Sequence, residues 1–196
     1  MKKNTKKIVT AAGIAAGTAA VASLSAYVTI KALIDTALDR EMPKVMEKAD
    51  KRISGEKSSD EFTNRMESAS ESLAVQPNET VEIIAHDGEK LVGHYFPCEK
   101  PERVIIAFHG WRSSWHRDFG MISDFWYKNN CSVLYVEQRG QNNSSGEYMG
   151  FGLTERFDCL DWLNWEIERC GSDIPVYLAG VSMGATTVLM AAGLQL

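Results

Sequence analysis

The sequence contains few cysteines, and they form no metal-binding pattern. The four lie far apart, with no Cys-x-x-Cys pair: Cys98, Cys131, Cys159 and Cys170. This spacing argues against a zinc site, and no motif for another metal or for an organic cofactor is present. The spacing leaves open whether any of the cysteines pair.

Basic residues are scarce after the first seven positions. Four of the 21 Lys and Arg residues lie in residues 1–7, which leaves 17 against 26 Asp and Glu residues, a net charge of −9 for the rest of the chain. Nucleic-acid binding depends on Lys and Arg side chains that neutralise phosphates. The acidic body therefore argues against a nucleic-acid partner. At 196 residues the chain is long enough for one globular domain with additional segments.

Charge is absent from residues 8–30, "IVTAAGIAAGTAAVASLSAYVTI". As a helix this stretch would span about 35 Å, and the hydrocarbon core of a bilayer is about 30 Å thick. We predict a transmembrane signal anchor over residues 8–30, with residues 1–7 as a basic cytoplasmic tail and the rest of the chain outside the cytoplasm. Two alternatives remain open. One is a signal peptide cleaved near Ala20-Val21-Ala22, which would give a secreted protein, and the other is a soluble Ala-rich helix.

Residues 31–75 are charged, with apolar residues at the spacing of one helical face. The first run extends from Ile34 to Ile53, and a second contains Phe62, Met66, Ala69 and Leu73. Ser58 and Glu61 have the spacing of a capping box at the start of the second run. We predict a pair of amphipathic helices that form a charged stalk or pack on the domain that follows.

Residues 78–196 have the pattern of an α/β domain. Two β-rich runs flank Asp87-Gly88, a pair that favours a hairpin turn. Two apolar runs suited to buried strands follow, each with a helical stretch after it, and the second helix, from Thr154 to about Arg169, places Phe157, Leu160 and Ile167 on one side. The last strand is "PVYLAG". This alternation predicts a mostly parallel sheet with helices on both faces.

The stretch "LAGVSMGATT" places Ser182 between Gly180 and Gly184, after this last strand and before an apolar helical segment. In a Gly-x-Ser-x-Gly elbow the serine occupies a strained turn that exposes its Oγ, and the glycines allow strand and helix to approach closely. The helix also directs the positive end of its dipole toward the serine. The pattern predicts a nucleophilic serine.

Residues 81–196 resemble the N-terminal half of an α/β-hydrolase. The hairpin, "FHGW" after the third strand, "VEQRGQNNSSGEY" after the fourth and "GVSMG" at the elbow occur in the family's order. The resemblance implies Ser182 as the nucleophile and an oxyanion hole formed by the backbone N–H groups of Trp111 and Met183. It also implies hydrolysis through an acyl-serine intermediate, which needs no metal or cofactor.

The loop after the fourth strand departs from the family's frequent Asp-x-Arg-Gly-x-Gly-x-Ser pattern. Glu137 replaces the acid and Asn142 the second glycine, and Asn tolerates a left-handed conformation better than most residues. We expect the loop to keep its shape, with Arg139 as a structural anchor rather than a substrate ligand.

The family's catalytic acid and histidine follow the serine in the chain. Only 14 residues follow Ser182, and none is an acid or a histidine. Among the upstream histidines, His109 lies beside the oxyanion loop, where we expect it to shape the backbone, and His116, expected on a loop near the site, is the one to test as a base. Without a base the serine hydroxyl is a weak nucleophile, so we expect these residues to be an inactive fragment of a longer protein, truncated after the elbow. We also expect the strand before Ser182 to form a bare sheet edge.

Two functional hypotheses follow. The first is a membrane-anchored serine hydrolase that acts on an ester, thioester or amide bond of a small acyl or peptide-like substrate, with its domain outside the cytoplasm. The second is an anchored, non-catalytic binding protein that has kept the α/β-hydrolase fold. Residues beyond Leu196 would discriminate between them, because only the first hypothesis needs an acid and a histidine there.

Overall fold

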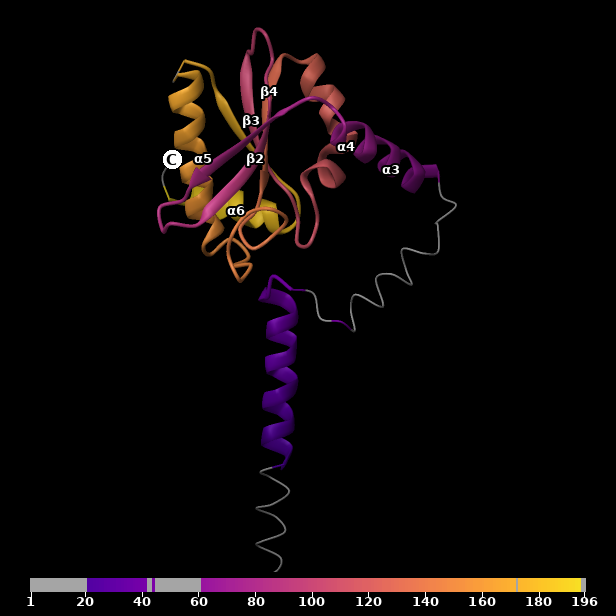
Figure 1. The fold of residues 1–196 in the computed structure, drawn as a ribbon, viewed down its shortest axis with the longest axis vertical. Helices are drawn as coiled ribbons and strands as arrows, with labels where there is room; N and C mark the ends of the chain where they lie inside the picture. The colour runs from indigo at the N-terminus through magenta and orange to yellow at the C-terminus, as the bar shows by residue number, and fades with distance from the viewer. Residues whose placement is uncertain (1–20, 42–43, 45–60, 172, 195–196) are drawn as a thin grey trace, which may run out of the picture. The chain divides into compact units, whose positions relative to one another are not determined.

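The residues of the computed structural model fall into two compact units that divide after Asp39 (Figure 1). The described residues are 21–41, 44, 61–171 and 173–194. Several predictions fall on other residues and lie outside this description. They concern the basic tail, the first part of the signal anchor, most of the stalk and the Ser58 half of the capping box.

The described part of the first unit contains a helix, Val21–Leu38, that is long and apolar enough to cross a membrane. None of it is buried. The helix continues past Ile30, the predicted end of the span, and Lys31 and Asp35 form an ion pair of 2.8 Å on its surface. A signal sequence near an N-terminus meets the same criteria of length and composition, so membrane anchoring stays a prediction.

The second unit is built on a five-stranded sheet in the order β1-β2-β4-β3-β5 (Figure 1). The strands are β1 (Glu79–Ile84), β2 (Lys90–Phe96), β3 (Arg103–Phe108), β4 (Cys131–Glu137) and β5 (Val176–Gly180). The helices of this unit are α3 (Glu61–Ala74), α4 (Trp115–Lys128), α5 (Glu155–Cys170) and α6 (Met183–Ala192).

The sheet is mixed, so the prediction of a mostly parallel sheet is wrong. β1 and β2 are antiparallel because a tight turn joins them, in which the Gly88 N–H donates to the Ala85 carbonyl at 2.9 Å. β2 is also antiparallel to β4. β3 pairs in parallel with both β4 and β5, since helical crossovers connect these three strands.

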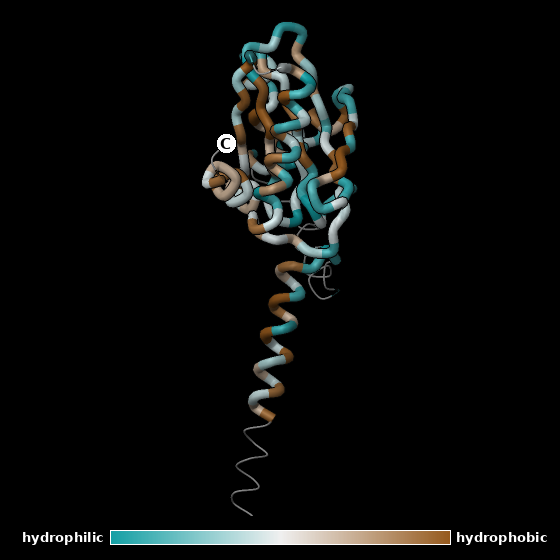
Figure 2. The backbone as a smooth tube through the Cα atoms, turned by 90° about the vertical axis from the view of Figure 1, so that its left-hand side faces the viewer, coloured by the Kyte–Doolittle hydropathy of each residue, from teal (hydrophilic) through white to brown (hydrophobic). Residues whose placement is uncertain are grey.

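Helices cover both faces of the sheet, as predicted. Successive β3 side chains enter opposite cores: Ile105 packs in the core with Phe119 of α4, and Ile106 in the core with Trp162 of α5. Figure 1 shows α5 on one side of the sheet and α4 with α3 on the other. Hydrophobic residues are concentrated in the strands between these layers, as the colouring of the tube by residue hydropathy shows (Figure 2). β3 and β4 are therefore the buried strands that the two apolar runs predicted.

The predicted helical run from Phe62 to Leu73 forms α3, which packs closely against α4. A Cβ on Gly120 of α4 would lie 2.7 Å from backbone atoms of Ala69 and Ser70. Leu73 is fully buried, whereas Phe62 is exposed. Contact between the two helix backbones thus depends on the glycine in α4, and α3 adds a layer to the domain.

Strand β5 lies at the edge of the sheet, as expected. Tyr177 is 55% exposed, and Leu189 of the following helix is also exposed. A groove of about 300 Å³ runs beside this edge and is lined by residues of β3, β5 and the end of α4, including Trp126 and Tyr177. The strand that leads to the candidate nucleophile therefore has a neighbouring strand, β3, on one side only.

Candidate active site

Ser182 occupies a strained turn between β5 and α6. Its backbone has φ 51° and ψ −113°, a conformation that non-glycine residues rarely adopt. The side chain is exposed and makes no capping hydrogen bond to α6, although the residue stands at the N-cap position. A serine at an N-cap ordinarily uses its hydroxyl to cap the helix. Here Oγ is left available, as the elbow motif predicts.

The two elbow glycines lie where strand and helix backbones touch. A Cβ on Gly180 would collide with the carbonyl oxygen of Gly184. A Cβ on Gly184 would collide with the carbonyl oxygen of Phe108, at the end of β3. Both positions therefore require glycine for space, which brings the first turn of α6 directly against the sheet.

The structure brings the elbow next to the loop that follows β3. A Cβ on Gly110 would lie 3.4 Å from the Cβ of Ser182, so Gly110 is a direct neighbour of the candidate nucleophile. Trp111 is the next residue of this loop. Met183 is the first residue of α6, and its N–H belongs to the first turn, where helical N–H groups have no partner within the helix. The candidate oxyanion donors Trp111 and Met183 therefore belong to two segments that meet at Ser182.

Two polar side chains that the sequence analysis did not single out hold this loop in place. Asp118, in the first turn of α4, accepts hydrogen bonds from the Gly110 N–H and the Ser113 hydroxyl, both at 2.6 Å. Gln138 donates its amide to the His109 carbonyl and accepts from Thr187 of α6 at 2.7 Å. Asp118 lies outside the motifs given above, and Gln138 occupies a variable position of the stretch "VEQRGQNNSSGEY". The motifs therefore did not indicate either contact.

The buried ring of His109 is held as a neutral imidazole. Its Nε2 accepts from the Gln138 N–H at 3.2 Å, and its Nδ1 lies 2.8 Å from the Gly110 carbonyl oxygen, which can only accept. The proton therefore sits on Nδ1. Burial lowers the pKa of His109, consistent with the neutral form. Because its free lone pair already accepts hydrogen bonds, His109 shapes the loop and is not placed to act as a base.

The other three histidines are also engaged elsewhere. His116, the histidine to test as a base, lies in the first turn of α4 and not on a loop as expected. Its Nδ1 is 2.9 Å from the Ser70 hydroxyl and its Nε2 is 3.1 Å from the Ser114 hydroxyl. The remaining two contact carboxylates: His94 with Glu137 and His86 with Asp161, at 2.8 and 2.9 Å. The sequence contains four histidines, so each has hydrogen-bond partners other than Ser182.

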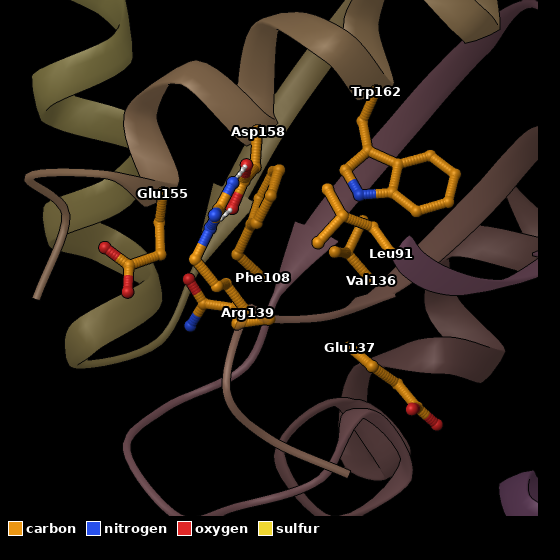
Figure 3. A pocket seen from close by; sticks show the side chains of 9 residues that line it. Leu91, Phe108, Val136, Glu137, Arg139, Glu155, Asp158 and Trp162 are labelled. Carbon is orange, nitrogen blue, oxygen red and sulfur yellow. Dashed lines mark hydrogen bonds and ion pairs between the residues drawn. The ribbon is translucent and has the colours of Figure 1, made fainter. Parts of the chain in front are cut away.

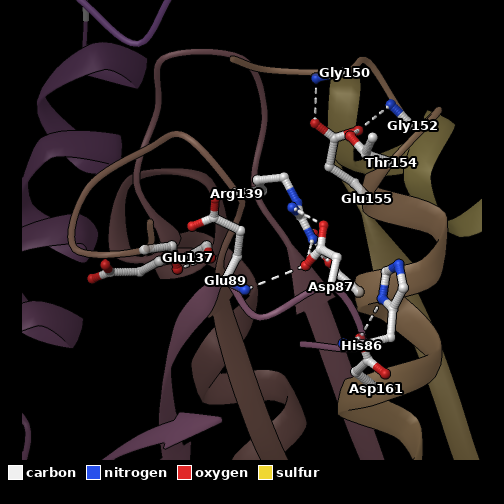
Figure 4. Close-up of polar contacts among 12 residues, drawn as sticks. His86, Asp87, Glu89, Glu137, Arg139, Gly150, Gly152, Thr154, Glu155 and Asp161 are labelled. Carbon is white, nitrogen blue, oxygen red and sulfur yellow. Dashed lines mark hydrogen bonds and ion pairs between the residues drawn. The ribbon is translucent and has the colours of Figure 1, made fainter. Parts of the chain in front are cut away.

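Arg139 is an anchor inside the domain, as expected. Its guanidinium donates to Asp158 of α5 and to Asp87 of the β1–β2 turn, the latter at 2.6 Å (Figure 4). Figure 3 shows the Arg139–Asp158 pair between α5 and the sheet, with Glu137 pointing away from it. The same carboxylates raise the pKa of Arg139 further, so the guanidinium stays charged. Asn142 has φ 50°, the left-handed conformation predicted for it.

Three side chains near this anchor come close enough to hold a cation: His86, Asp158 and Asp161 have ligand atoms within 4.8 Å of one another. Asp158, however, is hydrogen-bonded to the Arg139 guanidinium. Asp161 accepts from both the backbone N–H and the ring of His86. The permanent positive charge of Arg139 beside Asp158 opposes the binding of a cation. These three residues therefore do not fit a metal site.

Glu137 fixes the start of the loop that follows β4. Burial raises its pKa, but hydrogen bonds from His94 and from the Asn143 N–H, at 2.8 and 2.6 Å, outweigh burial and hold the pKa below its usual value. A carboxylate with a lowered pKa stabilises the fold above its unfolded-state pKa, and this contribution is lost as the pH falls through the folded-state pKa.

We therefore expect the domain to lose stability on acidification below about pH 5, and to lose less in Glu137→Gln. The measurement is the free energy of unfolding in urea from pH 3 to pH 7. Glu82→Gln, which removes an exposed carboxylate paired with Lys90, should retain the wild-type acid dependence. An unchanged dependence in Glu137→Gln would contradict the assignment.

Comparison with solved structures identifies the fold. An esterase from Pyrococcus furiosus matches with a TM-score of 0.52 and 26% identity, over 60% of this chain and 46% of that one. An α/β serine hydrolase without a lid from Xanthomonas campestris matches with a TM-score of 0.53 and 19% identity, over 61% and 57%. An α/β-hydrolase from Penicillium matches with a TM-score of 0.52 and 22% identity, over 60% and 42%.

The described α/β domain therefore has the α/β-hydrolase fold. The chain spans less than half the length of the Pyrococcus furiosus esterase that it matches. No family model matches the sequence, and no curated protein matches it.

Proposed function

We propose that this chain belongs to a serine hydrolase, with Ser182 as the nucleophile. The observation that carries the proposal is the geometry of Ser182: a strained, exposed serine, without a capping bond, at the start of α6. The likeness to esterases and other α/β-hydrolases supports hydrolysis as the reaction class. The apolar helix Val21–Leu38 supports anchoring in a membrane. The four Lys residues in positions 1–7 are the reason to propose that the domain lies outside the cytoplasm.

The proposed reaction is acyl transfer followed by hydrolysis. Ser182 Oγ attacks the carbonyl carbon of an ester, thioester or amide and gives its proton to a base. The backbone N–H groups of Met183 and Trp111 donate hydrogen bonds to the oxyanion that develops on the carbonyl oxygen. The alcohol, thiol or amine leaves with that proton, and water then releases the acid from Ser182. Because the four histidines of this sequence are engaged elsewhere, the proposal requires a base and an acid that, in the family's order, follow the nucleophile in the chain.

The test is covalent labelling of the whole gene product with a fluorophosphonate probe, which reacts with activated serines. We expect labelling at Ser182 and its loss in Ser182→Ala. Ser68→Ala, which removes an exposed hydroxyl from α3, serves as the control and should still be labelled. Labelling that survives in Ser182→Ala would refute the proposal.

A second candidate is an anchored binding protein with the same fold and no catalytic activity, which agrees with the engagement of all four histidines by partners other than Ser182. This candidate predicts that neither the wild type nor Ser182→Ala reacts with the probe. It also predicts that the chain beyond Leu196 supplies no acid and histidine at strand ends. Reading the coding sequence past that residue therefore distinguishes the two candidates independently of the labelling.

A further inference from the structure

Arg40 is bound by the loop that follows β4. Its guanidinium donates to the carbonyl oxygens of Ser144, Asn142 and Gly146 at 2.6, 2.7 and 3.3 Å. Its backbone N–H donates to the Glu147 carbonyl at 2.8 Å. Four hydrogen bonds to main-chain carbonyls fix this residue on the loop.

The loop that follows β3 is bound to the same segment. Arg112 donates from its guanidinium to the carbonyl oxygens of Arg40 and Glu41, at 3.2 and 3.3 Å. Its backbone N–H donates to the Gln141 side chain in the loop after β4 at 2.6 Å. Residues 40–41 are therefore joined to both loops that lie at the carboxyl ends of β3 and β4, where Ser182 also stands.

Exposed apolar side chains follow directly after this attachment. The segment that begins after Glu147 carries Tyr148, Phe151 and Leu153, and Tyr148 and Leu153 are 59% and 61% exposed. The segment also touches the helix that begins at the elbow, because a Cβ on Gly152 would lie 2.9 Å from Thr186 Cγ2. We call residues 148–153 the apolar rim. The rim lies beside the candidate site, and its exposed side chains are those of Tyr148, Phe151 and Leu153.

The apolar helix is covalently attached at this point. Leu38 is its last residue, and only Asp39 separates it from Arg40. One residue spans less than about 4 Å, so the end of the helix and the two loops are linked by a very short segment, whatever direction the helix takes. The predicted span ends at Ile30, so residues 31–39 separate it from Arg40 by at most about 15 Å. If the span is embedded in a bilayer, the bilayer surface therefore lies within about that distance of the two loops.

We propose that the Ser182 site takes its substrate from the bilayer, as the acyl ester of a membrane lipid, with the apolar rim lying on the membrane surface. The inference rests on the proposed function, both its nucleophile and its anchor. Apolar side chains at a membrane surface are buried about 5–10 Å deep, at the boundary between headgroups and acyl chains. The ester bonds of lipids lie at that same boundary, so a rim at this depth would present them to Ser182.

The first experiment measures depth in the membrane. The full chain, with the half-buried Cys98 and Cys170 replaced by Ser, carries one fluorophore on Leu153→Cys and is reconstituted in phosphatidylcholine vesicles whose acyl chains bear a nitroxide quencher. Zwitterionic lipid is chosen because the domain is acidic. Control positions are Val28→Cys in the helix and Glu99→Cys, an exposed site in the turn between β2 and β3, at the opposite end of the parallel strands.

We expect quenching at position 153 close to that at position 28 and several-fold above that at position 99. Tyr148→Cys provides a second position on the rim and should behave like position 153. Quenching at position 28 without quenching at either rim position would overturn the inference and leave the anchor intact. No quenching at position 28 would instead remove the anchor from the proposed function.

The second experiment tests the substrate class. In the whole gene product, a hexadecyl fluorophosphonate dissolved in the same vesicles should label Ser182 several-fold faster than a short water-soluble fluorophosphonate at equal total concentration. It should also label faster than the hexadecyl probe in separate vesicles. Labelling by the soluble probe with no advantage for the membrane probe would overturn the lipid substrate and retain the serine hydrolase. Labelling by neither probe would count against the proposed function itself.

Discussion

Replacing Gly184 by Ala is expected to destabilise the domain by about 3 kcal/mol. The added methyl group would collide with the carbonyl oxygen of Phe108 and lie 2.8 Å from that of His109. Both neighbours are backbone atoms, one at the end of β3 and one in the buried residue that follows it, so they cannot move aside as a flexible side chain would. Relief requires α6 to shift away from the sheet, which would also displace the strained turn at Ser182.

The matched control is Gly193→Ala, at the end of the same helix. There the nearest atom to the new methyl group would be the Met190 carbonyl oxygen at 3.4 Å, an ordinary contact. We expect a change of less than about 1 kcal/mol at this position. Urea unfolding followed by circular dichroism measures both variants. Equal stabilities for the two would show that α6 does not depend on contact with β3.

Replacing Arg139 by Met is expected to cost about 3–5 kcal/mol, because it leaves a buried carboxylate without its partner. The side chain of Asp158 is only 4% exposed and bonds the guanidinium directly. Asp87, the second partner, is more exposed and can be solvated by water. The loss should therefore come mainly from Asp158.

A double variant separates charge burial from simple loss of packing. Arg139→Met combined with Asp158→Leu removes both members of the buried pair, and we expect it to be markedly more stable than Arg139→Met alone. Lys90→Met, which breaks an exposed pair with Glu82, should change stability by less than about 1 kcal/mol. A double variant no more stable than the single one would rule out an unpaired charge as the cause.

Local sequence patterns were sufficient to predict much of the fold. Asp87-Gly88 predicted a hairpin, since a turn with a positive φ is a property of adjacent residues, and Gly88 has φ 95°. Runs of apolar residues predicted β3 and β4 because a strand covered on both faces is apolar throughout. The Gly-x-Ser-x-Gly spacing predicted a sharp turn between strand and helix, and the backbone of Ser182 has that conformation.

The buried face of α5 could not be predicted in this way. The apolar side chains Phe157, Leu160 and Ile167 suggested one face, yet Ile167 is 39% exposed. The buried face instead includes three acidic residues: Glu155, Asp158 and Glu166. Asp158 and Glu155 are buried there with hydrogen-bond donors that lie outside the helix. Arg139 bonds Asp158, and the backbone N–H groups of the 150–152 turn bond Glu155 (Figure 4).

The sequence by itself determined the position of the candidate nucleophile, because an elbow is encoded within five consecutive residues. It also determined the apolar helix near the N-terminus, since length and composition define such a helix. The surroundings of the nucleophile were decided by the tertiary structure alone. Asp118 and Gln138 hold the loop beside Ser182, and the loops that bind Arg40 follow two different strands. The contacts of Gln138 and Arg40 join segments 29 or more residues apart in the chain, so no local pattern encodes them.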